Sequence, residues 1–246
     1  MTSKVEIDCG IPLPGTLLPR ERWTCTAWRD DGRPFDWSRV YGRIAPRVLD
    51  VGCGDGRYLI GSAFARPDRD HLGIELLQPL IDRATRRADR RGLANVRFVA
   101  GDAVAWLFKR LDPDSVDEIH VYHPQPYYDP AEVHLGMLTP GFFERAWRVL
   151  RREGILVLQT DDKAYGRYLI ESARKHFAPE ILPGPWPDAP AGRTRREIVA
   201  RRKKRAILRV VARRREEPLP IAVPPPYFDP DRPGLRKRRS RRTRGH

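Results

Sequence analysis

Residues 48–56 constrain the fold of this chain more strongly than any other segment, because they join an apolar strand to a glycine-rich turn. Residues 48–51 are Val-Leu-Asp-Val, an apolar and β-branched pattern typical of a strand buried in a parallel sheet. Gly52, Gly54 and Gly56 follow, and glycines allow the backbone to turn tightly and to approach a ligand. The segment therefore predicts a ligand-binding turn at the carboxyl end of a parallel strand.

Acidic residues follow the next two apolar runs. Glu75 comes after residues 71–74, and Asp102 comes shortly after residues 96–100. In a parallel sheet these acids lie at the same edge as the glycine turn, where a carboxylate can accept hydrogen bonds from both hydroxyl groups of a ribose. We therefore expect Glu75 to bind a ribose and Asp102 to accept a hydrogen bond from the amino group of adenine.

The glycine spacing distinguishes two classes of cofactor. A dinucleotide-binding turn has glycine at its first, third and sixth positions. Counted from Gly52, the sixth position here is Arg57, and the third glycine, Gly56, arrives one place early. Asp50, two residues before the first glycine, is typical of methyltransferases. These features favour S-adenosyl-L-methionine as the cofactor, and the residues expected to bind it are Asp50, Gly52, Gly54, Glu75 and Asp102.

Apolar runs alternate with amphipathic stretches from residue 36 onward. This alternation predicts an α/β fold, a doubly wound Rossmann-like sheet of the class I methyltransferase type with helices on both faces. The expected helices are 57–65, 78–91, 103–109, 141–151 and 163–176, and the expected strands include 116–122 and 155–160. We further expect a tight turn at Gly154, a Pro-rich connection at 179–190 and an edge strand within 198–211. The arginines of the second helix that we expect to face solvent are Arg83, Arg86, Arg87 and Arg90.

Three regions are expected. Residues 1–35 are predicted to form an irregular arm, residues 36–212 a methyltransferase domain, and residues 213–246 a Pro-rich linker with a basic disordered tail. The three cysteines are too few and too widely spaced for a disulfide framework or a zinc site, which favours a reducing cytoplasm and no structural metal. The oligomeric state, monomer or homodimer, is left open.

The positive charge is concentrated near the C-terminus. Residues 193–246 hold 20 Lys and Arg against 5 Asp and Glu, whereas residues 1–192 hold 27 of each. A cationic block of this kind attracts phosphates, so nucleic acid is the expected partner. The sequence contains no long apolar span and no signal peptide, so a membrane location is not expected.

Further motifs, in order along the chain, resemble one family. They are Pro124-Gln125-Pro126-Tyr127, Thr160-Asp161 with Tyr165 nearby, and Thr194-Arg195-Arg196-Glu197. Together with the glycine turn, Glu75 and Asp102, they make residues 36–211 similar to the bacterial tRNA guanine-N7 methyltransferases. The resemblance implies transfer of a methyl group from S-adenosyl-L-methionine to N7 of a guanosine in the variable loop of tRNA.

The resemblance also assigns roles to individual residues. Gln125 occupies the position of the family's catalytic aspartate, and Asp129 occupies that of a lysine that contacts the substrate. Asp161, Thr194 and Glu197 are expected to bind the base. The family's basic loop after the Pro-Asp-Pro-Trp motif is missing here, because residues 128–135 read Tyr-Asp-Pro-Ala-Glu-Val-His-Leu.

Other interpretations of the same residues stay open. Asp161 or Asp162 could cap a helix, and residues 194–197 could form a capping box. The histidines at 120, 123 and 134 are expected in core or surface roles. The whole chain could be a catalytically silent homologue that binds cofactor and RNA, or a methyltransferase for a small molecule or a protein.

Overall fold

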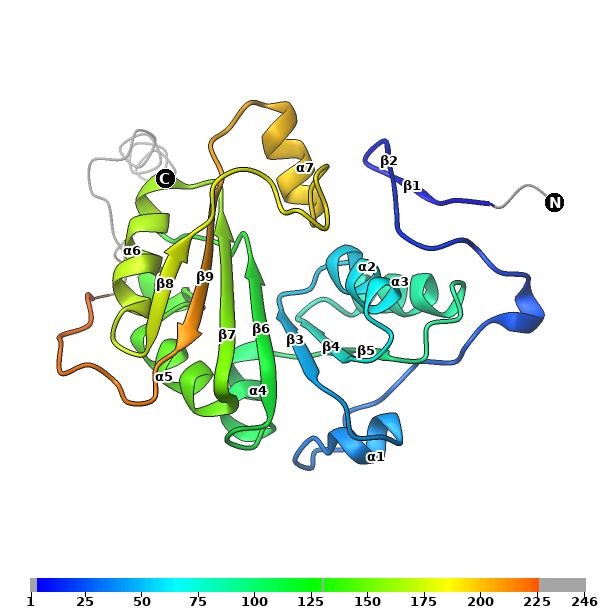
Figure 1. The fold of residues 1–246 in the computed structure, drawn as a ribbon, viewed down its shortest axis with the longest axis horizontal. Coiled ribbons are helices and arrows are strands. Elements are labelled where there is room, and N and C mark those ends of the chain that lie inside the picture. Colours follow the sequence, from blue (N-terminus) through cyan, green and yellow to red (C-terminus); the bar gives the residue numbers. More distant parts are fainter. Residues whose placement is uncertain (1–3, 130, 226–246) are drawn as a thin grey trace, which may run out of the picture.

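A seven-stranded sheet forms the centre of the molecule (Figure 1). The structure is a computed structural model and describes residues 4–129 and 131–225 of the 246-residue chain. The strand order is β5-β4-β3-β6-β7-β9-β8, with β9 antiparallel to both of its neighbours and the strands from β5 to β7 parallel to one another. The strands are β3 (Arg47–Val51), β4 (Asp70–Glu75), β5 (Val96–Ala100), β6 (Val116–Tyr122), β7 (Leu150–Thr160), β8 (Phe177–Ile181) and β9 (Leu208–Arg214).

Helices cover both faces of this sheet, which confirms the predicted doubly wound α/β fold (Figure 1). Side chains alternate along each strand, so Val48 joins the core beneath α2 and α3, whereas Leu49 joins the core beneath α4, α5 and α6. The helices are α1 (Trp37–Tyr41), α2 (Arg57–Ala65), α3 (Gln78–Asp89), α4 (Ala103–Lys109), α5 (Pro140–Val149), α6 (Lys163–Ala173) and α7 (Arg195–Arg202).

The prediction of a turn at Gly154 is wrong. Strand β7 begins at Leu150, directly after α5, and Gly154 lies inside it beside a register shift. A Cβ atom at Gly154 would lie 2.8 Å from the carbonyl oxygen of Arg151, so the glycine permits a close backbone approach at a bulge. Gly154 therefore lies at a bulge within β7 and not at the turn before the strand.

The prediction of an edge strand within 198–211 is also wrong. The first part of that segment belongs to α7, and the second part begins β9, which lies between β7 and β8. On this side of the sheet the edge strand is β8, and most of β8, from Pro179 onward, falls within the predicted Pro-rich connection. A proline is compatible with an edge strand, where one side of the backbone needs no partner.

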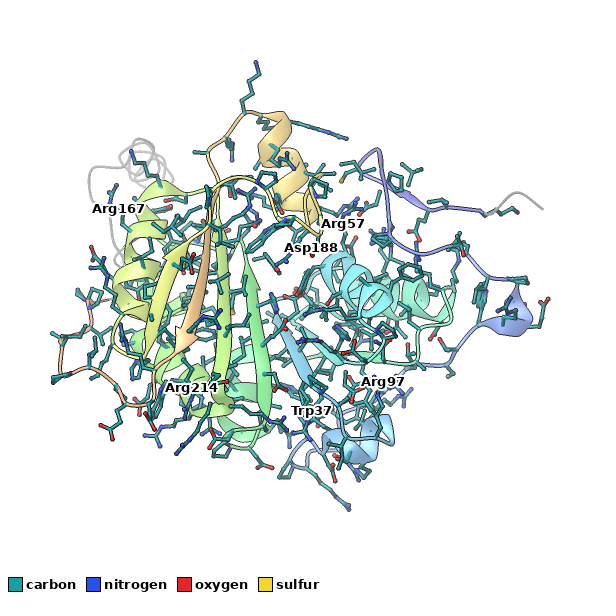
Figure 2. All side chains as sticks on the ribbon, viewed as in Figure 1. Trp37, Arg57, Arg97, Arg167, Asp188 and Arg214 are labelled. Atoms are coloured by element: carbon teal, nitrogen blue, oxygen red, sulfur yellow. The ribbon has the colours of Figure 1, made fainter. Side chains whose placement is uncertain are left out.

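An N-terminal arm packs on α2 and α3. It contains β1 (Ile7–Asp8), β2 (Ile11–Pro12) and the 3₁₀ turn η1 (Arg20–Arg22). Arg87 was predicted to face solvent, but it is buried beneath this arm and pairs with Glu6 and with Asp55, each at 2.8 Å. Arg57, labelled in Figure 2, is buried against Asp8 at 3.1 Å. Tertiary contact with the arm therefore overrides the amphipathic pattern of α3.

The linker and tail are described only in part. After β9, the N–H group of Leu219 donates to the carbonyl oxygen of Lys175 at 2.7 Å, so this stretch runs beside the turn that follows α6. The rest of the predicted linker and tail, residues 226–246, lies outside the described residues. The boundaries of the three predicted regions stay a prediction.

We expect Gly73→Ala to destabilise the sheet. An added Cβ at Gly73, inside β4, would lie 2.7 Å from Phe98 and 2.8 Å from Cys53 and Leu59, and such overpacking costs roughly 1–3 kcal/mol. Gly141→Ala is the matched control, because its Cβ would meet atoms only at 3.8 Å and alanine favours a helix. Urea unfolding should separate the two variants, and a Gly73→Ala protein as stable as the wild type would contradict this packing.

Candidate functional site

The carboxyl ends of the parallel strands border a cavity of about 360 Å³. Residues after β3, at the end of β6 and in α7 line it, and α7 lies beyond this edge of the sheet (Figure 1). Ligands of open α/β sheets bind at this edge, where the strand order reverses direction. The sequence-predicted residues among those that line the cavity are Asp50, Gly52, Gly54 and Thr194.

The glycine turn exposes backbone to this cavity. Gly52 and Gly54 have positive φ angles of 77° and 56°, and a Cβ atom at either position would meet nothing within 4 Å. Gly56 differs, because its Cβ would lie 2.8 Å from Ala84 and 2.9 Å from Phe98. The first two glycines therefore leave room for a ligand, and the third allows α3 and β5 to pack closely.

Asp50 has the properties of a residue that requires a ligand. Its side chain is 2% exposed, and Oδ1 has no hydrogen-bond partner among the described residues. Burial, with a contribution from the nearby Glu75, raises the pKa of the Asp50 carboxyl well above its usual value. A buried, unpaired carboxylate is costly, so a cationic group in the adjoining cavity would stabilise it. The α-amino group of S-adenosyl-L-methionine is such a group, and the site fits this cofactor.

Glu75 and Asp102 lie at the ends of neighbouring strands, as the sequence predicted. One carboxylate oxygen of Glu75 accepts from the N–H of Gly54 at 3.0 Å and the other from the N–H of Leu76 at 2.9 Å, which ties the glycine turn to β4. Asp102 caps α4 by accepting from Val104 and Ala105. Neither acid lines the 360 Å³ cavity, so their contacts with a cofactor stay a prediction.

A second cavity of about 170 Å³ adjoins the first. His123 and Arg196 line both cavities, so the two spaces share a wall. Gln125 lines the second cavity and is exposed, and its side-chain Nε2 donates to the carbonyl oxygen of Pro126 at 3.0 Å. Asp161 and Asp162 line it from the end of β7. The structure therefore brings residues of two separate sequence motifs together beside the glycine turn.

His123 was not predicted as a site residue. It follows β6 directly, has a positive φ of 52°, and bridges Asp161 at 3.0 Å and Gln159 at 2.8 Å through its two ring nitrogens. Burial lowers the pKa of His123 despite the hydrogen bond with Asp161. Its position immediately after a parallel strand is the sequence signal that could have identified it.

Asp161 is held by three neighbours. Besides His123, it accepts hydrogen bonds from Arg205 at 2.9 Å and from Arg196 at 3.3 Å. Burial would raise the pKa of Asp161, but the hydrogen bonds from Arg205, His123 and Arg196 outweigh it and lower the pKa to about 2. Asp161 is therefore ionised and surrounded by positive charge, whereas Asp162 caps α6 by accepting from the N–H of Tyr165.

Thr194 and Glu197 have structural partners. The Thr194 hydroxyl accepts from the N–H of Glu197 at 3.1 Å and caps α7. Glu197 is fully buried, with one carboxylate oxygen bound by Arg209 at 2.6 Å and the other by the N–H of Arg193 at 2.8 Å. Thr194 lines the first cavity, but Glu197 lines neither cavity. Thr194 therefore caps α7 as one interpretation predicted, but Glu197 accepts from the N–H of Arg193 instead of that of Thr194, so the motif is not a complete capping box. Contact of the motif with a base stays a prediction.

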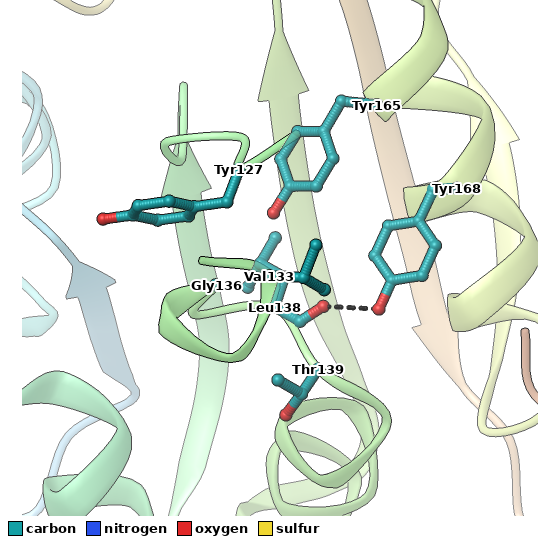
Figure 3. A pocket seen from close by; sticks show the side chains of 7 residues that line it. All are labelled: Tyr127, Val133, Gly136, Leu138, Thr139, Tyr165 and Tyr168. Atoms are coloured by element: carbon teal, nitrogen blue, oxygen red, sulfur yellow. Dashed lines mark hydrogen bonds between the residues drawn. The ribbon is translucent and has the colours of Figure 1, made fainter. Parts of the chain in front are cut away.

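Asp129 lies in the loop that follows Gln125. Its carboxylate accepts from the N–H of Ala131 at 3.0 Å, and it lines neither of the two cavities. The same loop packs on α6 around a small pocket of about 10 Å³, roughly the space of one water molecule (Figure 3). There Tyr165 stacks on Tyr168, whose hydroxyl donates to the carbonyl oxygen of Leu138 at 2.8 Å (Figure 3).

The family of the chain follows from a comparison of sequences. Residues 44–210 match the family model Methyltransf_4, which is described as "Putative methyltransferase". The chain belongs to this methyltransferase family. Membership confirms the prediction of S-adenosyl-L-methionine as the methyl donor. The matched range contains the glycine turn, both cavities and α7.

Curated relatives carry a more specific name. The chain is 29% identical over 190 residues to the tRNA (guanine-N(7)-)-methyltransferase of Alkalilimnicola ehrlichii, which covers 76% of this chain and 80% of the relative. It is 32% identical to the enzyme of that name from Paraburkholderia xenovorans and 34% identical to that from Thermus thermophilus. These two matches cover 55% and 62% of this chain but only 52% and 50% of the relatives, so the chain spans about half of their length.

A solved structure shares the fold. The crystal structure of the 16S rRNA methyltransferase KamB superposes with a TM-score of 0.53 and 17% sequence identity, over 72% of this chain and 92% of that one. Within the described residues, no helix is long and apolar enough to span a membrane. The same residues contain no group of three or more His, Cys, Asp or Glu that could hold a metal ion.

Replacement of Asp50 should separate stability from cofactor binding. Because the carboxylate is buried with one oxygen unpaired, Asp50→Asn should raise the free energy of unfolding at neutral pH by on the order of 1 kcal/mol. Since the folded-state pKa is raised, this advantage should shrink as the pH falls and Asp50 takes up a proton. Calorimetric titration should show weaker S-adenosyl-L-methionine binding, and unchanged affinity would contradict the assignment.

The buried pair of Glu197 and Arg209 should be essential to α7. Arg209→Ala leaves the Glu197 carboxylate buried without its cation, which should cost roughly 3–5 kcal/mol in urea unfolding. The double variant Glu197→Gln with Arg209→Met removes both charges and should recover most of this loss. If Arg209→Ala alone is no less stable than the wild type, the pair does not anchor the helix.

Proposed function

We propose that this protein transfers the methyl group of S-adenosyl-L-methionine to N7 of a guanosine in tRNA, in the variable loop. The single observation that carries the proposal is the pair of adjoining cavities, one beside the glycine turn and one beside Gln125 and Asp161, with His123 in the wall between them. The names of the curated relatives support the same substrate. A tRNA substrate also favours a cytoplasmic location.

The first cavity is proposed to receive the cofactor. Asp50 would bind the α-amino group, and the backbone of Gly52 and Gly54 would approach the cofactor closely. The ribose and adenine would extend beyond this cavity, where Glu75 and Asp102 would bind them. When bound, S-adenosyl-L-methionine supplies a methyl group on a positively charged sulfur. Backbone N–H groups already donate hydrogen bonds to Glu75 and Asp102. Each carboxylate oxygen has two lone pairs, so both residues can still accept hydrogen bonds from a cofactor.

The second cavity is proposed to receive the guanine. N7 carries a lone pair and no proton, so its attack on a methyl group requires no general base. The protein must instead hold N7 in line with the methyl group at near-attack distance, which converts a bimolecular reaction into an intramolecular one. Asp161, fixed by His123, and the exposed amide of Gln125 are the groups available to accept hydrogen bonds from the N–H groups of guanine.

Charge in the second cavity affects the rate. Methylation of N7 places positive charge on the base, and a carboxylate at position 125 would stabilise it, whereas an amide supplies only a dipole. The loss of one preorganised polar group costs roughly 10²–10³ in rate. Asp161 is already bound by Arg196 and Arg205, so its own contribution is reduced. These two observations favour slow turnover, and they support a silent cofactor- and RNA-binding protein as the second candidate.

The direct test is nucleoside mass spectrometry. tRNA that lacks 7-methylguanosine should acquire it after incubation with this protein and S-adenosyl-L-methionine. Cofactor binding is measured in the same preparation. If cofactor binds and no 7-methylguanosine forms, the proposed activity is wrong, and the protein is either a silent binder or a methyltransferase for a different substrate.

Gln125→Asp should accelerate methyl transfer. Restoring a carboxylate beside the base should raise the single-turnover rate by about 10², while Gln125→Ala, which removes the acceptor, should lower it. Both substitutions are at an exposed side chain, so folding should be unaffected. Equal rates for all three proteins would show that position 125 does not contact the reacting base.

A further inference from the structure

Two arginines reach the second cavity from outside. Arg196 lies in the first turn of α7, and Arg205 lies shortly after that helix ends. Their side chains are 59% and 50% exposed, whereas the side chain of Asp161, which both of them contact, is only 6% exposed. The cations therefore face solvent on one side and the cavity on the other.

Positive charge surrounds this pair. Lys203 and Lys204 are exposed between α7 and Arg205, and Lys204 adopts a positive φ of 52° in the turn. The loop that begins at Gln125 lines the cavity with Gln125, Pro126 and Tyr128, none of which carries a positive charge. The cationic wall of the cavity is therefore the α7 side, and not the loop that follows Gln125.

Arg196 and Arg205 can exchange their contacts with Asp161 for contacts with a phosphate. Water reaches both arginines, whose side chains are half-exposed, and screens their ion pairs with Asp161, so an incoming anion can compete for them. A guanidinium presents a planar fork of donors that matches the oxygens of a phosphate, and two such forks lie side by side here. His123 would keep its hydrogen bond to Asp161 after the arginines turn away.

We propose that Arg196 and Arg205 form a phosphate-binding pair at the mouth of the second cavity, a role that rests on the proposed function. The pair binds a backbone phosphate next to the nucleotide that enters the cavity. As the guanidinium groups turn toward the phosphate, the Asp161 carboxylate becomes available to the N–H groups of the base. Asp161 thus holds the arginines in place before RNA binds, and the phosphate releases it.

RNA binding over a range of salt concentrations tests the pair. We would measure fluorescence anisotropy of a labelled tRNA transcript with the full chain and with Arg196→Gln/Arg205→Gln. The double variant should bind at least tenfold more weakly at moderate salt, and the slope of log affinity against log salt should fall by about 1–2. An unchanged slope and affinity would overturn the proposal.

Arg148→Gln is the matched control. Arg148 is 55% exposed and pairs with Glu144 on α5, so it has the same chemistry and a similar environment away from the cavity. This variant should bind RNA like the wild type. A loss equal to that of the double variant would show that only overall charge matters, and would also overturn the proposal.

Asp161→Asn distinguishes a phosphate site from a purely structural ion pair. If Asp161 competes with phosphate for the arginines, Asp161→Asn should bind inorganic phosphate more tightly than the wild type does. The affinity is measured from the NMR shifts of the arginine Nε–H groups during a phosphate titration. A structural role predicts weaker or unchanged binding, which would contradict the proposal. The wild-type protein could bind inorganic phosphate through Arg196 and Arg205 and yet not bind tRNA. That result would support the phosphate-binding pair and would contradict the proposed tRNA function.

Discussion

Parallel pairing of β3 with β4 and β6 is the constraint on which the rest of the site depends. It fixes the register of Asp50 opposite Gly73 and His120, so the residues that follow all three strands emerge at one edge of the sheet. The glycine turn, Glu75 and His123 are consequently neighbours although they are far apart in sequence. A slip by one residue would exchange the faces of a strand and separate them.

The second constraint is the burial of Glu197 against Arg209. This ion pair joins the first turn of α7 to β9, the antiparallel strand beside β7. Because α7 is held there, Thr194 reaches the first cavity and Arg196 reaches both. The pair of Glu197 and Arg209 thus positions the helix that carries other site residues.

The sequence predicted helices and strands correctly where the local hydrophobic pattern agrees with burial in the tertiary structure. The residues of α2, α4 and β6 were predicted within their observed bounds, because apolar periodicity and turn residues there match burial. It failed for Arg87, which a helical pattern assigns to solvent, and for the edge of the sheet, which a proline obscured. Both errors involve contacts between segments far apart in sequence, and no local pattern encodes such contacts.

Residue types and their spacing were enough to predict the α/β class, the glycine turn and the acids at successive strand ends, since these features depend on local sequence. The binding of Asp161 by His123, Arg196 and Arg205 follows from the folded arrangement of the chain and not from any local pattern. The same holds for the burial of Glu197 against Arg209. The physical reason is that charge pairing depends on distance in space, and the antiparallel return of β9 sets those distances after the chain has folded.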